Sequence, residues 1–225
     1  MKQIVSLLAT FLDFFFPRIC LGCDMEGAYL CHTCENLLKE TVSQNSLHTD
    51  FLDTVFIACE YDNQNLIGKL IKRIKYKFSE ELADSLADIV VQNLIDSIDW
   101  SNIGILIPVP LSKERRKWRG FNQAELIGGK IVRRLNKLGI DTRIEDEILR
   151  KVKDTPPQAA CSSKLERLAN VENAFEVNKN IRPPNAVILF DDVYTTGTTM
   201  NECAKTLKNA GVKNVFGLVI AKKKV

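Results

Sequence analysis

The feature that most constrains the fold of this chain is the run of residues 187–199, which reads VILFDDVYTTGTT. Its first four residues are apolar, and three of them are β-branched or aromatic, as is typical of a strand buried on both faces of a parallel sheet. Asp191 and Asp192 follow, where we expect the strand to leave the sheet. Threonines around Gly197 form the next segment, and the sequence from Met200 onward favours a helix. We therefore expect a strand, an acidic pair, a loop of small residues and a helix in direct succession.

This succession predicts a site for a phosphorylated sugar. Backbone N–H groups of the loop and of the helix N-terminus can hold a phosphate, and the two carboxylates can accept hydrogen bonds from sugar hydroxyls. Gly197 allows the backbone to close tightly around phosphate oxygens. Hydroxyl donors are added by Thr195, Thr196, Thr198 and Thr199. The alternative is an acidic turn that only caps a helix, but two acids before a Thr/Gly loop favour phosphate binding.

Four cysteines near the N-terminus predict a structural zinc site. They form two Cys-x-x-Cys pairs, Cys20 with Cys23 and Cys31 with Cys34. Each pair can point two thiolates at one position, and two pairs complete the tetrahedral shell of Zn²⁺. A disulfide pair and a redox motif are the alternatives, but thiols stay reduced in the cytosol and a redox site needs only one pair. Four sulfur ligands leave no open position, so we expect the metal to be structural rather than catalytic.

The length of 225 residues accommodates one α/β domain with a small appended module. We expect the module, an amphipathic helix followed by the zinc finger, in residues 1–50 and the α/β domain in residues 51–225. Apolar residues between 4 and 15 lie on one helix face. Asp13 interrupts them and no cleavage site follows, which argues against a signal peptide. No other segment is long enough to span a bilayer, so we expect a cytoplasmic protein.

Apolar runs and helix-periodic segments alternate along the rest of the chain, which predicts a largely parallel sheet with helices on both faces. Strands are expected over residues 54–61, 103–107, 143–151, 175–177, 187–190 and 215–220. Helices are expected over residues 66–78, 80–98, 123–138, 162–170 and 200–210, together with a short helix and a linker between 37 and 50.

Two basic clusters are candidate anion sites, although the net charge of +3 is too small to imply a polyanionic partner by itself. The first places five cations and Trp118 within residues 113–119, in a loop that follows a strand. Since ligands bind at the carboxyl ends of parallel strands, this loop should face the Thr/Gly loop. The second cluster comprises Arg150, Lys151 and Lys153, in a segment that we expect to be mobile. A solvated basic surface is the alternative interpretation of both clusters.

The order of these motifs resembles the ComF family over nearly the whole chain. After the cysteine pairs come LIKRIKY (70–76), PVP (108–110), RGFNQ (119–123) and the signature DDVYTTG (191–197). That signature is similar to the one with which type I phosphoribosyltransferases bind phosphoribosyl pyrophosphate (PRPP). The resemblance implies a phosphoribosyltransferase-like domain behind a zinc finger, with Mg²⁺ accompanying PRPP. It also implies single-stranded DNA and a helicase-like competence protein as partners in DNA uptake.

The resemblance assigns roles to individual residues. Asp191 and Asp192 would hold the ribose hydroxyls near Mg²⁺ and act as the catalytic residues. The 5′-phosphate would be bound by Thr195, Thr196, Gly197, Thr198 and Thr199. The diphosphate would contact Pro108, Val109, Pro110 and Arg119. A flexible loop that closes over PRPP would include Arg150, Lys151 and Lys153.

Two functions follow, and the sequence leaves both open. One is an active phosphoribosyltransferase of nucleotide metabolism, in which pyrophosphate leaves PRPP as an acceptor attacks C1′. The other is a PRPP-binding accessory protein that supports DNA uptake by binding single-stranded DNA. Phosphate contacts and stacking surfaces for DNA are expected from Lys69, Lys72, Arg73, Lys75, Arg115, Arg116 and Trp118. We favour the accessory role, and no segment identifies an acceptor.

Overall fold

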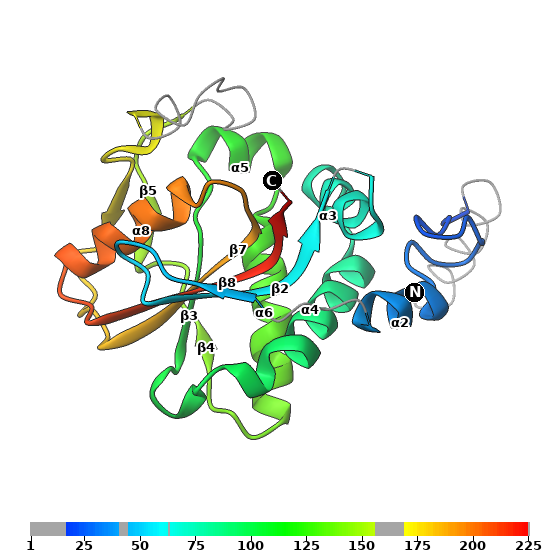
Figure 1. The fold of residues 1–225 in the computed structure, drawn as a ribbon. Coiled ribbons are helices and arrows are strands. Elements are labelled where there is room, and N and C mark those ends of the chain that lie inside the picture. Colours follow the sequence, from blue (N-terminus) through cyan, green and yellow to red (C-terminus); the bar gives the residue numbers. More distant parts are fainter. Residues whose placement is uncertain (1–16, 41–44, 63, 156–168, 225) are drawn as a thin grey trace, which may run out of the picture.

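A computed structural model describes residues 17–40, 45–62, 64–155 and 169–224 (Figure 1). The N-terminal helix expected over residues 4–15, and most of the helix expected over 162–170, lie outside these ranges. No helix of the described ranges combines the length and the apolar character needed to cross a membrane. The division of the chain at residue 50 stays a prediction.

The strands of the described chain are β1 (Asn45–Leu47), β2 (Thr54–Tyr61), β3 (Ile105–Pro108), β4 (Arg143–Ile144), β5 (Leu149–Lys151), β6 (Phe175–Val177), β7 (Ala186–Tyr194) and β8 (Asn214–Lys223). Its helices are α2 (His32–Glu40), α3 (Leu66–Tyr76), α4 (Glu80–Leu94), α5 (Lys113–Arg119), α6 (Gln123–Lys137) and α8 (Thr198–Asn209). Two short 3₁₀ helices, η1 (Ile95–Ser97) and η2 (Trp100–Asn102), lie between α4 and β3. The strands predicted over 54–61 and 175–177 are confirmed residue for residue.

Six strands form one sheet in the order β1-β2-β8-β7-β3-β4. Strand β1 is antiparallel to β2, and every other neighbouring pair is parallel. Helices α3, α4 and α6 cover one face of this sheet, and α8 covers the other (Figure 1). Strands β5 and β6 form a separate antiparallel pair that contacts α8. The predicted fold class, a mainly parallel sheet with helices on both faces and a small cysteine module, is confirmed.

The central strand β7 divides its side chains between two apolar cores. Val187 and Leu189 pack in the core beneath α8, whereas Ile188 and Phe190 pack in the core beneath α4 and α6. All four side chains are fully buried. Burying side chains of this size stabilises a fold by roughly 1.5–3 kcal/mol each. The continuous apolar run therefore anchors the strand between the two cores. As a result, the position of Asp191 and Asp192, which follow it, is also fixed.

Two parts of the predicted topology are wrong. Residues 143–151 do not form one strand, because β4 pairs with β3 whereas β5 pairs with β6 in the second sheet. Glu145, Asp146 and Glu147 separate the two strands, and successive acidic residues are unfavourable within a strand. The segment expected as a linker, within residues 37–50, contains β1 as an antiparallel edge strand.

Helix starts agree with the capping residues. The Ser79 hydroxyl accepts a hydrogen bond from the Leu82 N–H at 3.3 Å, where α4 begins. The Asn122 side chain accepts one from the Ala124 N–H at 3.0 Å, where α6 begins. Helix α4 ends earlier than predicted, because the chain turns into η1 after Leu94.

Candidate functional site

The acid pair lies within β7 rather than after it. Strand β7 stays paired with β8 as far as Tyr194, opposite Lys222, whereas its pairing with β3 ends at Phe190. We expected the strand to leave the sheet at the acids: its pairing with β3 does end there, but β8 is long enough to continue the pairing on the other side. Asp191 and Asp192 therefore stand where one neighbouring strand has ended, at the carboxyl edge of the sheet. Asp192 is 3% exposed and Asp191 is partly exposed.

Lys75, near the end of α3, forms an ion pair with Asp192 in which Nζ and Oδ2 are 2.8 Å apart. From the sequence we expected Lys75 to contact DNA phosphates. Instead its side chain is 27% exposed and points at the acid pair. Ile74, the preceding residue, is fully buried in the core under α3, which brings the end of the helix down to this edge of the sheet.

The two carboxyl groups differ in their electrostatics. Burial and the charge of Asp192 raise the pKa of Asp191 well above its ordinary value. Burial alone would raise the pKa of Asp192 as well, but the charge of Lys75 and hydrogen bonds, one of them from Gln123, lower it. One carboxyl is thus held ionised while its neighbour tends to keep a proton, as expected for two acids that share a poorly hydrated site.

The loop between β7 and α8 has the tight backbone that the sequence predicts. Gly197 has a φ of +72°, and a Cβ atom there would lie 2.0 Å from the Tyr194 hydroxyl oxygen. Glycine is therefore required at this corner. The hydroxyls of Thr196 and Thr198 lie 2.7 Å apart, and α8 begins at Thr198. Since the N-cap residue Gly197 has no side chain to offer an oxygen, the helix N-terminus suits an anionic ligand.

The Pro-Val-Pro segment follows β3 at the same edge of the sheet. The Val109 N–H donates to the Phe190 carbonyl at 2.8 Å. The Asn122 side-chain amide donates to the Val109 carbonyl at 3.1 Å. Pro108 and Pro110 are thereby held between β7 and the start of α6, beside the strand that carries the acid pair.

The basic segment 113–119 is the helix α5 and not the loop that we expected. The Ser112 hydroxyl accepts a hydrogen bond from the Arg115 N–H at its start, and Gly120 ends it with a φ of +79°. Lysine, glutamate and arginine are favourable helix residues, so an N-cap serine and a left-handed glycine are sufficient to delimit a short helix.

Two cations from different elements approach the acid pair besides Lys75. Arg119 of α5 donates to the Gln123 side-chain oxygen at 3.0 Å, and Gln123 is one of the groups that lower the pKa of Asp192. Lys151 of β5 lies close enough to Asp191 for the two charges to interact. Burial, followed by the charge of a nearby arginine, lowers the pKa of Lys151. The site is therefore approached by basic groups from α5 and from the second sheet.

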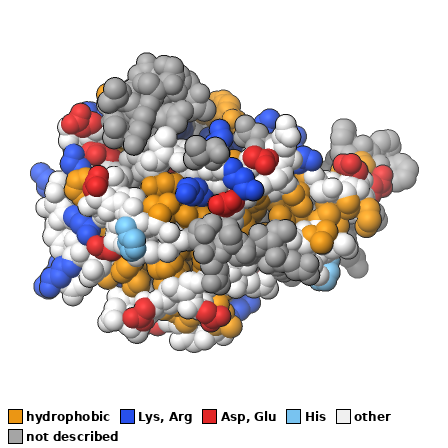
Figure 2. All heavy atoms as spheres, viewed as in Figure 1, with side chains coloured by type: hydrophobic (Ala, Val, Ile, Leu, Met, Phe, Trp, Pro, Cys, Tyr) orange, Lys and Arg blue, Asp and Glu red, His pale blue; other side chains and the backbone are white. Residues whose placement is uncertain are grey.

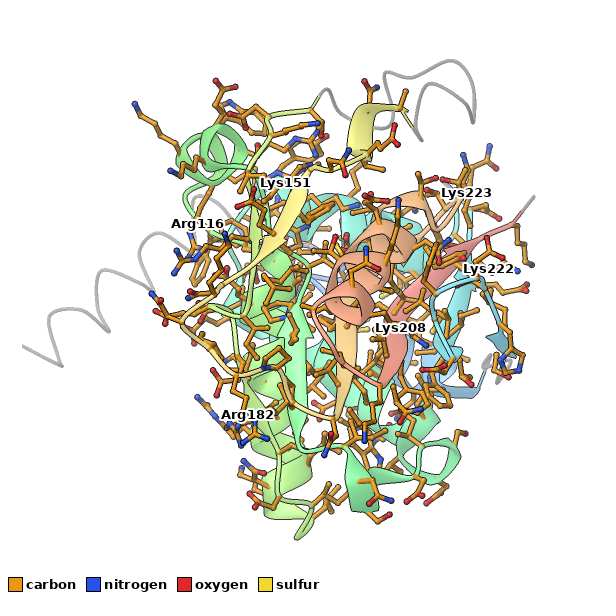
Figure 3. All side chains as sticks on the ribbon, turned by 90° about the vertical axis from the view of Figure 1, so that its left-hand side faces the viewer. Arg116, Lys151, Arg182, Lys208, Lys222 and Lys223 are labelled. Atoms are coloured by element: carbon orange, nitrogen blue, oxygen red, sulfur yellow. The ribbon has the colours of Figure 1, made fainter. Side chains whose placement is uncertain are left out.

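Part of the expected flexible loop is a strand. Arg150 and Lys151 belong to β5, where they pair with β6. Lys153 donates to the Glu172 carbonyl at 3.0 Å. In Figure 3 Lys151 and Arg116 lie at the same end of the molecule. The role of this segment as a loop that closes over a ligand stays a prediction.

The residues expected to contact DNA occupy two helices. Helix α3 carries Lys69, Lys72, Arg73 and Lys75, and α5 carries Arg115, Arg116 and Trp118. Some of these cations are engaged within the protein. The Arg73 guanidinium lies 4.1 Å from the centre of the Tyr29 ring, and Arg116 forms a 2.5 Å ion pair with Glu125. Basic and acidic side chains are interspersed over the face seen in Figure 2.

Exposed aromatic side chains connect the end of α3 with α5 and the start of α6. The rings of Tyr76 and Trp118 lie 6.1 Å apart and those of Phe78 and Phe121 5.3 Å apart, both edge to face. Tyr76 is 61% exposed, Phe78 58% and Trp118 72%. The Arg119 guanidinium lies 5.9 Å from the Tyr76 ring centre. Clustered exposed aromatic residues are typical of a binding surface.

The predicted zinc ligands come together in the cysteine module. The Sγ atoms of Cys20, Cys23, Cys31 and Cys34 all lie within 4.8 Å of one another, and those of Cys23 and Cys31 are 3.6 Å apart. A tetrahedral zinc ion with bonds of about 2.3 Å places its sulfur ligands about 3.8 Å apart, so the cluster is compatible with the ion. A Cβ atom on Gly22 would lie 2.7 Å from the Cys34 sulfur, which explains the glycine there.

Backbone groups favour the ionised form of one of the four thiols, whereas burial raises the pKa of the Cys34 thiol to about 12. Burial would raise the pKa of the Cys20 thiol, but N–H groups, chiefly those of Cys31 and Gly22, lower it to about 6. A thiol that ionises readily is a good metal ligand. The module is joined to α4 by an ion pair of 2.8 Å between Arg18 and Glu81.

Sequence reasoning missed several contributors to the site. Gln123 was noticed only as part of a motif, and Tyr61 of β2, whose pKa burial raises, was not considered although it faces Lys75. The local sequence carries no signal for either. Among the other expected ligand residues, Thr195 is exposed and Thr199 is partly exposed.

One relative aligns with almost all of this chain. It is Competence protein F of Haemophilus influenzae, which is 33% identical over 213 residues, 92% of this chain and 86% of that protein. The chain belongs to the ComF family. Competence protein ComFC of Bacillus subtilis is 37% identical over 67% of this ComF chain and 57% of its own length. The DNA utilization protein YhgH of Escherichia coli K12 is 28% identical over 66% of this chain and 64% of its own. No family model matches the chain.

Phosphoribosyltransferases are among the solved structures that resemble this ComF protein. An adenine phosphoribosyltransferase is 16% identical with a TM-score of 0.43, over 84% of this chain and 88% of the other. The orotate phosphoribosyltransferase of Aeropyrum pernix is 16% identical with a TM-score of 0.36, over 84% and 80%. Scores of this size carry no functional argument. The phosphoribosyltransferase-like character of the chain rests on its sheet, its DDVYTTG segment and its family.

Proposed function

We propose that this ComF protein binds PRPP at the carboxyl edge of its sheet and acts in DNA uptake by binding single-stranded DNA. The main observation behind the PRPP proposal is that Asp191 and Asp192 lie in β7 shortly before the N-terminus of α8, where Gly197 makes the turn. A pentose needs acceptors for its hydroxyls, and a terminal phosphate needs N–H and O–H donors. Strand β7 provides the carboxylate acceptors, and the loop and the start of α8, which follow it directly in the chain, provide the N–H and O–H donors.

Each part of PRPP has a partner in this proposal. Asp191 and Asp192 accept hydrogen bonds from the ribose hydroxyls, and the loop 195–199 binds the 5′-phosphate. The diphosphate contacts the backbone of residues 108–110 and the guanidinium of Arg119. Carboxylate and phosphate oxygens are the ligands that Mg²⁺ prefers, so Asp191 is the residue that would hold the ion beside PRPP. When bound, the ion would neutralise charge on the diphosphate.

Isothermal titration calorimetry with PRPP and Mg²⁺ tests this site. We expect Asp191→Asn to weaken PRPP binding about 10- to 100-fold, because a hydrogen bond to a charged group contributes about 1.5–3 kcal/mol. Asp96→Asn is the matched control, since Asp96 is exposed in η1, and it should bind PRPP like the unaltered protein. A wild-type protein that gives neither heat nor thermal stabilisation with PRPP would contradict the proposal.

The DNA part of the proposal draws on the relatives and on the exposed aromatic cluster. Two relatives are named competence proteins and a third is named a DNA utilization protein. Single strands are bound by aromatic faces on which bases stack and by cations that meet the phosphates. Tyr76 and Trp118 offer the stacking faces, and the exposed Lys72 and Lys117 flank them in sequence. A helicase-like partner and a cytoplasmic location belong to the same proposal.

Fluorescence anisotropy with a labelled oligothymidylate tests DNA binding. Trp118→Ala should weaken binding about 5- to 150-fold, the equivalent of about 1–3 kcal/mol per stacked base. Leu138→Ala is the control, because Leu138 is a 60% exposed apolar residue in another part of the surface. Binding should also weaken steeply as salt is raised. If Trp118→Ala and Leu138→Ala bind DNA equally well, the aromatic cluster is not part of the DNA interface.

An active phosphoribosyltransferase is the second candidate, and the approach of Lys151 to Asp191 favours it. In that reaction the acceptor forms a bond to C1′ while the bond from C1′ to the diphosphate oxygen breaks, and pyrophosphate leaves with the electron pair. Incubation with PRPP, Mg²⁺ and a panel of nucleobases distinguishes the candidates. Pyrophosphate release that Asp191→Asn abolishes supports the enzyme. Binding of PRPP and DNA without turnover supports the accessory protein.

A further inference from the structure

Lys75 differs from its neighbours on α3. Its Nζ lies 2.8 Å from Oδ2 of Asp192, whereas Lys69 and Lys72 are exposed. The side chain of Asp192 is 4% exposed and that of Lys75 is 27% exposed. The attraction between these charges is therefore screened less by water than that of a surface ion pair.

Lys75 is also the cation that the acid pair depends on. No other lysine or arginine of the described ranges lies within 4.0 Å of either carboxylate. The groups that face the pair from other elements are Tyr61 of β2, Gln123 of α6, Lys151 of β5 and Cys203 of α8. A buried carboxylate needs an ion-pair or hydrogen-bond partner to be stable. Lys75 is that ion-pair partner for Asp192, and it comes from within the chain.

Helix α3 is held in position because it also packs against the cysteine module. Lys69 Nζ donates to the Leu21 carbonyl at 3.3 Å. The Arg73 guanidinium lies 4.1 Å from the centre of the Tyr29 ring. Apolar residues of the helix share one core with two of the cysteines: Leu70, Ile71 and Ile74 with Cys20 and Cys34. These contacts hold α3 in place, so that Lys75 near its end lies next to Asp192.

We propose that Lys75 is a positioning residue of the PRPP site, whose ammonium group fixes the Asp192 carboxylate so that Asp191 can meet the ribose and its cation. This inference rests on the proposed function. Lys75 acts through Asp192 and has no contact of its own with PRPP. Without it the buried Asp192 carboxylate has no ion-pair partner, and the acid pair loses the orientation that presents Asp191 to the sugar.

Calorimetry with PRPP and Mg²⁺ tests the inference on three variants. Lys75→Met should bind PRPP at least about tenfold more weakly, because the charge-assisted contact that fixes the Asp192 carboxylate is lost. Lys75→Arg keeps the charge and should retain most of the affinity. Lys137→Met, at an exposed position near the end of α6, should bind like the wild type.

A second readout needs no PRPP. Carbon-13 NMR of labelled aspartate carboxyls should show the Asp192 signal displaced in Lys75→Met and close to its wild-type position in Lys75→Arg, with a folded state verified by thermal unfolding. Lys75→Gln replaces Lys75→Met if the latter does not fold. Wild-type binding of PRPP together with unaltered affinity and an unaltered Asp192 signal in Lys75→Met overturns this inference alone. Absence of PRPP binding by the wild type overturns the proposed function, and this inference with it.

Discussion

The cysteine module and the acid pair both bring groups of like charge close together, but the charge is balanced differently in the two regions. Each gathers groups that repel one another when ionised: four thiols within 4.8 Å in the module, and two neighbouring carboxyls in β7. The thiols form a closed ligand set whose balancing charge is that of an added metal ion. The carboxyls have Lys75, at 2.8 Å from Asp192, as a balancing charge from the chain itself. We therefore expect the first region to depend on an ion for its fold and the second to fold without one.

The two regions also differ in the apolar core that supports them. Among the module's residues that the structure describes, the buried apolar ones are Cys20, Leu30 and Cys34. Strand β7 alone buries the four consecutive residues 187–190, which lie between two cores. Small units with little core usually need a metal or a disulfide to remain folded. The metal should thus be the main stabiliser of the module, whereas apolar burial stabilises the sheet.

Loss of the metal is the change with the largest expected effect. Cys34→Ser removes a ligand, and structural zinc in finger peptides contributes about 10–16 kcal/mol of binding free energy at pH 7. We expect the zinc content, measured by plasma mass spectrometry, to fall to near zero. In hydrogen exchange, amides of residues 18–34 should lose protection, while those of β7 and β8 should keep it.

Cys59→Ala is the control for this experiment, because Cys59 is buried in β2 outside the cluster. It should keep its zinc. If protection of β7 collapses together with that of the module in Cys34→Ser, the two regions form one cooperative unit and the contrast drawn between them is wrong.

On the side of the acid pair, Gly197→Ala has the largest expected effect. Its Cβ would lie 2.0 Å from the Tyr194 hydroxyl oxygen at a φ of +72°, so the loop or the tyrosine must move. Strain of this kind costs about 1–3 kcal/mol, and the displaced loop should no longer bind PRPP. Urea unfolding measures the stability and calorimetry the affinity.

Gly129→Ala in α6 is the matched control, since no atom lies within 4 Å of its Cβ position. Alanine is a better helix residue than glycine, so this variant should gain up to about 1 kcal/mol and bind PRPP normally. Equal stabilities in the two variants would mean that the loop tolerates a side chain and has no fixed shape.

Local signals explain how much of the fold was predictable. The alternating run at 54–61 and the capping residues Ser79 and Asn122 act within a few residues of one another, and the elements they predict are present. The apolar run 187–190 identified the central strand because both of its faces are covered. Ser112 and Gly120 delimit α5 by the same local chemistry, so this helix could have been predicted as well.

Contacts between distant segments explain what was not predictable. From the sequence we grouped Lys75 with Lys72 as a DNA contact. Only the packing of α3 against the sheet and the cysteine module turns Lys75 toward Asp192. The position of the acids inside β7 depends on the length of β8, a strand that follows them in the sequence. The four cysteines needed no such context, because their spacing alone describes a ligand set.

A further difference between the regions should appear as a dependence of PRPP affinity on pH. The raised pKa of Asp191 means that a proton must leave before this carboxyl can accept the ribose hydroxyls. Affinity should therefore fall as the pH falls through that raised pKa, by up to about tenfold per pH unit. Asp192, with its lowered pKa, stays ionised throughout this window. Calorimetry at a series of pH values measures the profile.

Asp191→Asn separates this dependence from the titration of the PRPP phosphates, which also occurs near neutral pH. The variant should show a flatter profile at its lower affinity. A profile as steep as that of the wild type would assign the whole dependence to PRPP, and the electrostatic difference between the two acids would have no part in binding.

The smallest expected effect concerns the contact that joins the two regions. Tyr29→Leu keeps an apolar side chain against α3 but removes the ring that lies 4.1 Å from the Arg73 guanidinium. A cation–π contact at a partly exposed site contributes about 0.5–1 kcal/mol, so urea unfolding should show a loss of that size. PRPP affinity should change little, because apolar burial still holds α3, and Lys75 with it, in place. A drop in PRPP affinity larger than the loss of stability would mean that α3 transmits the state of the cysteine module to the acid pair.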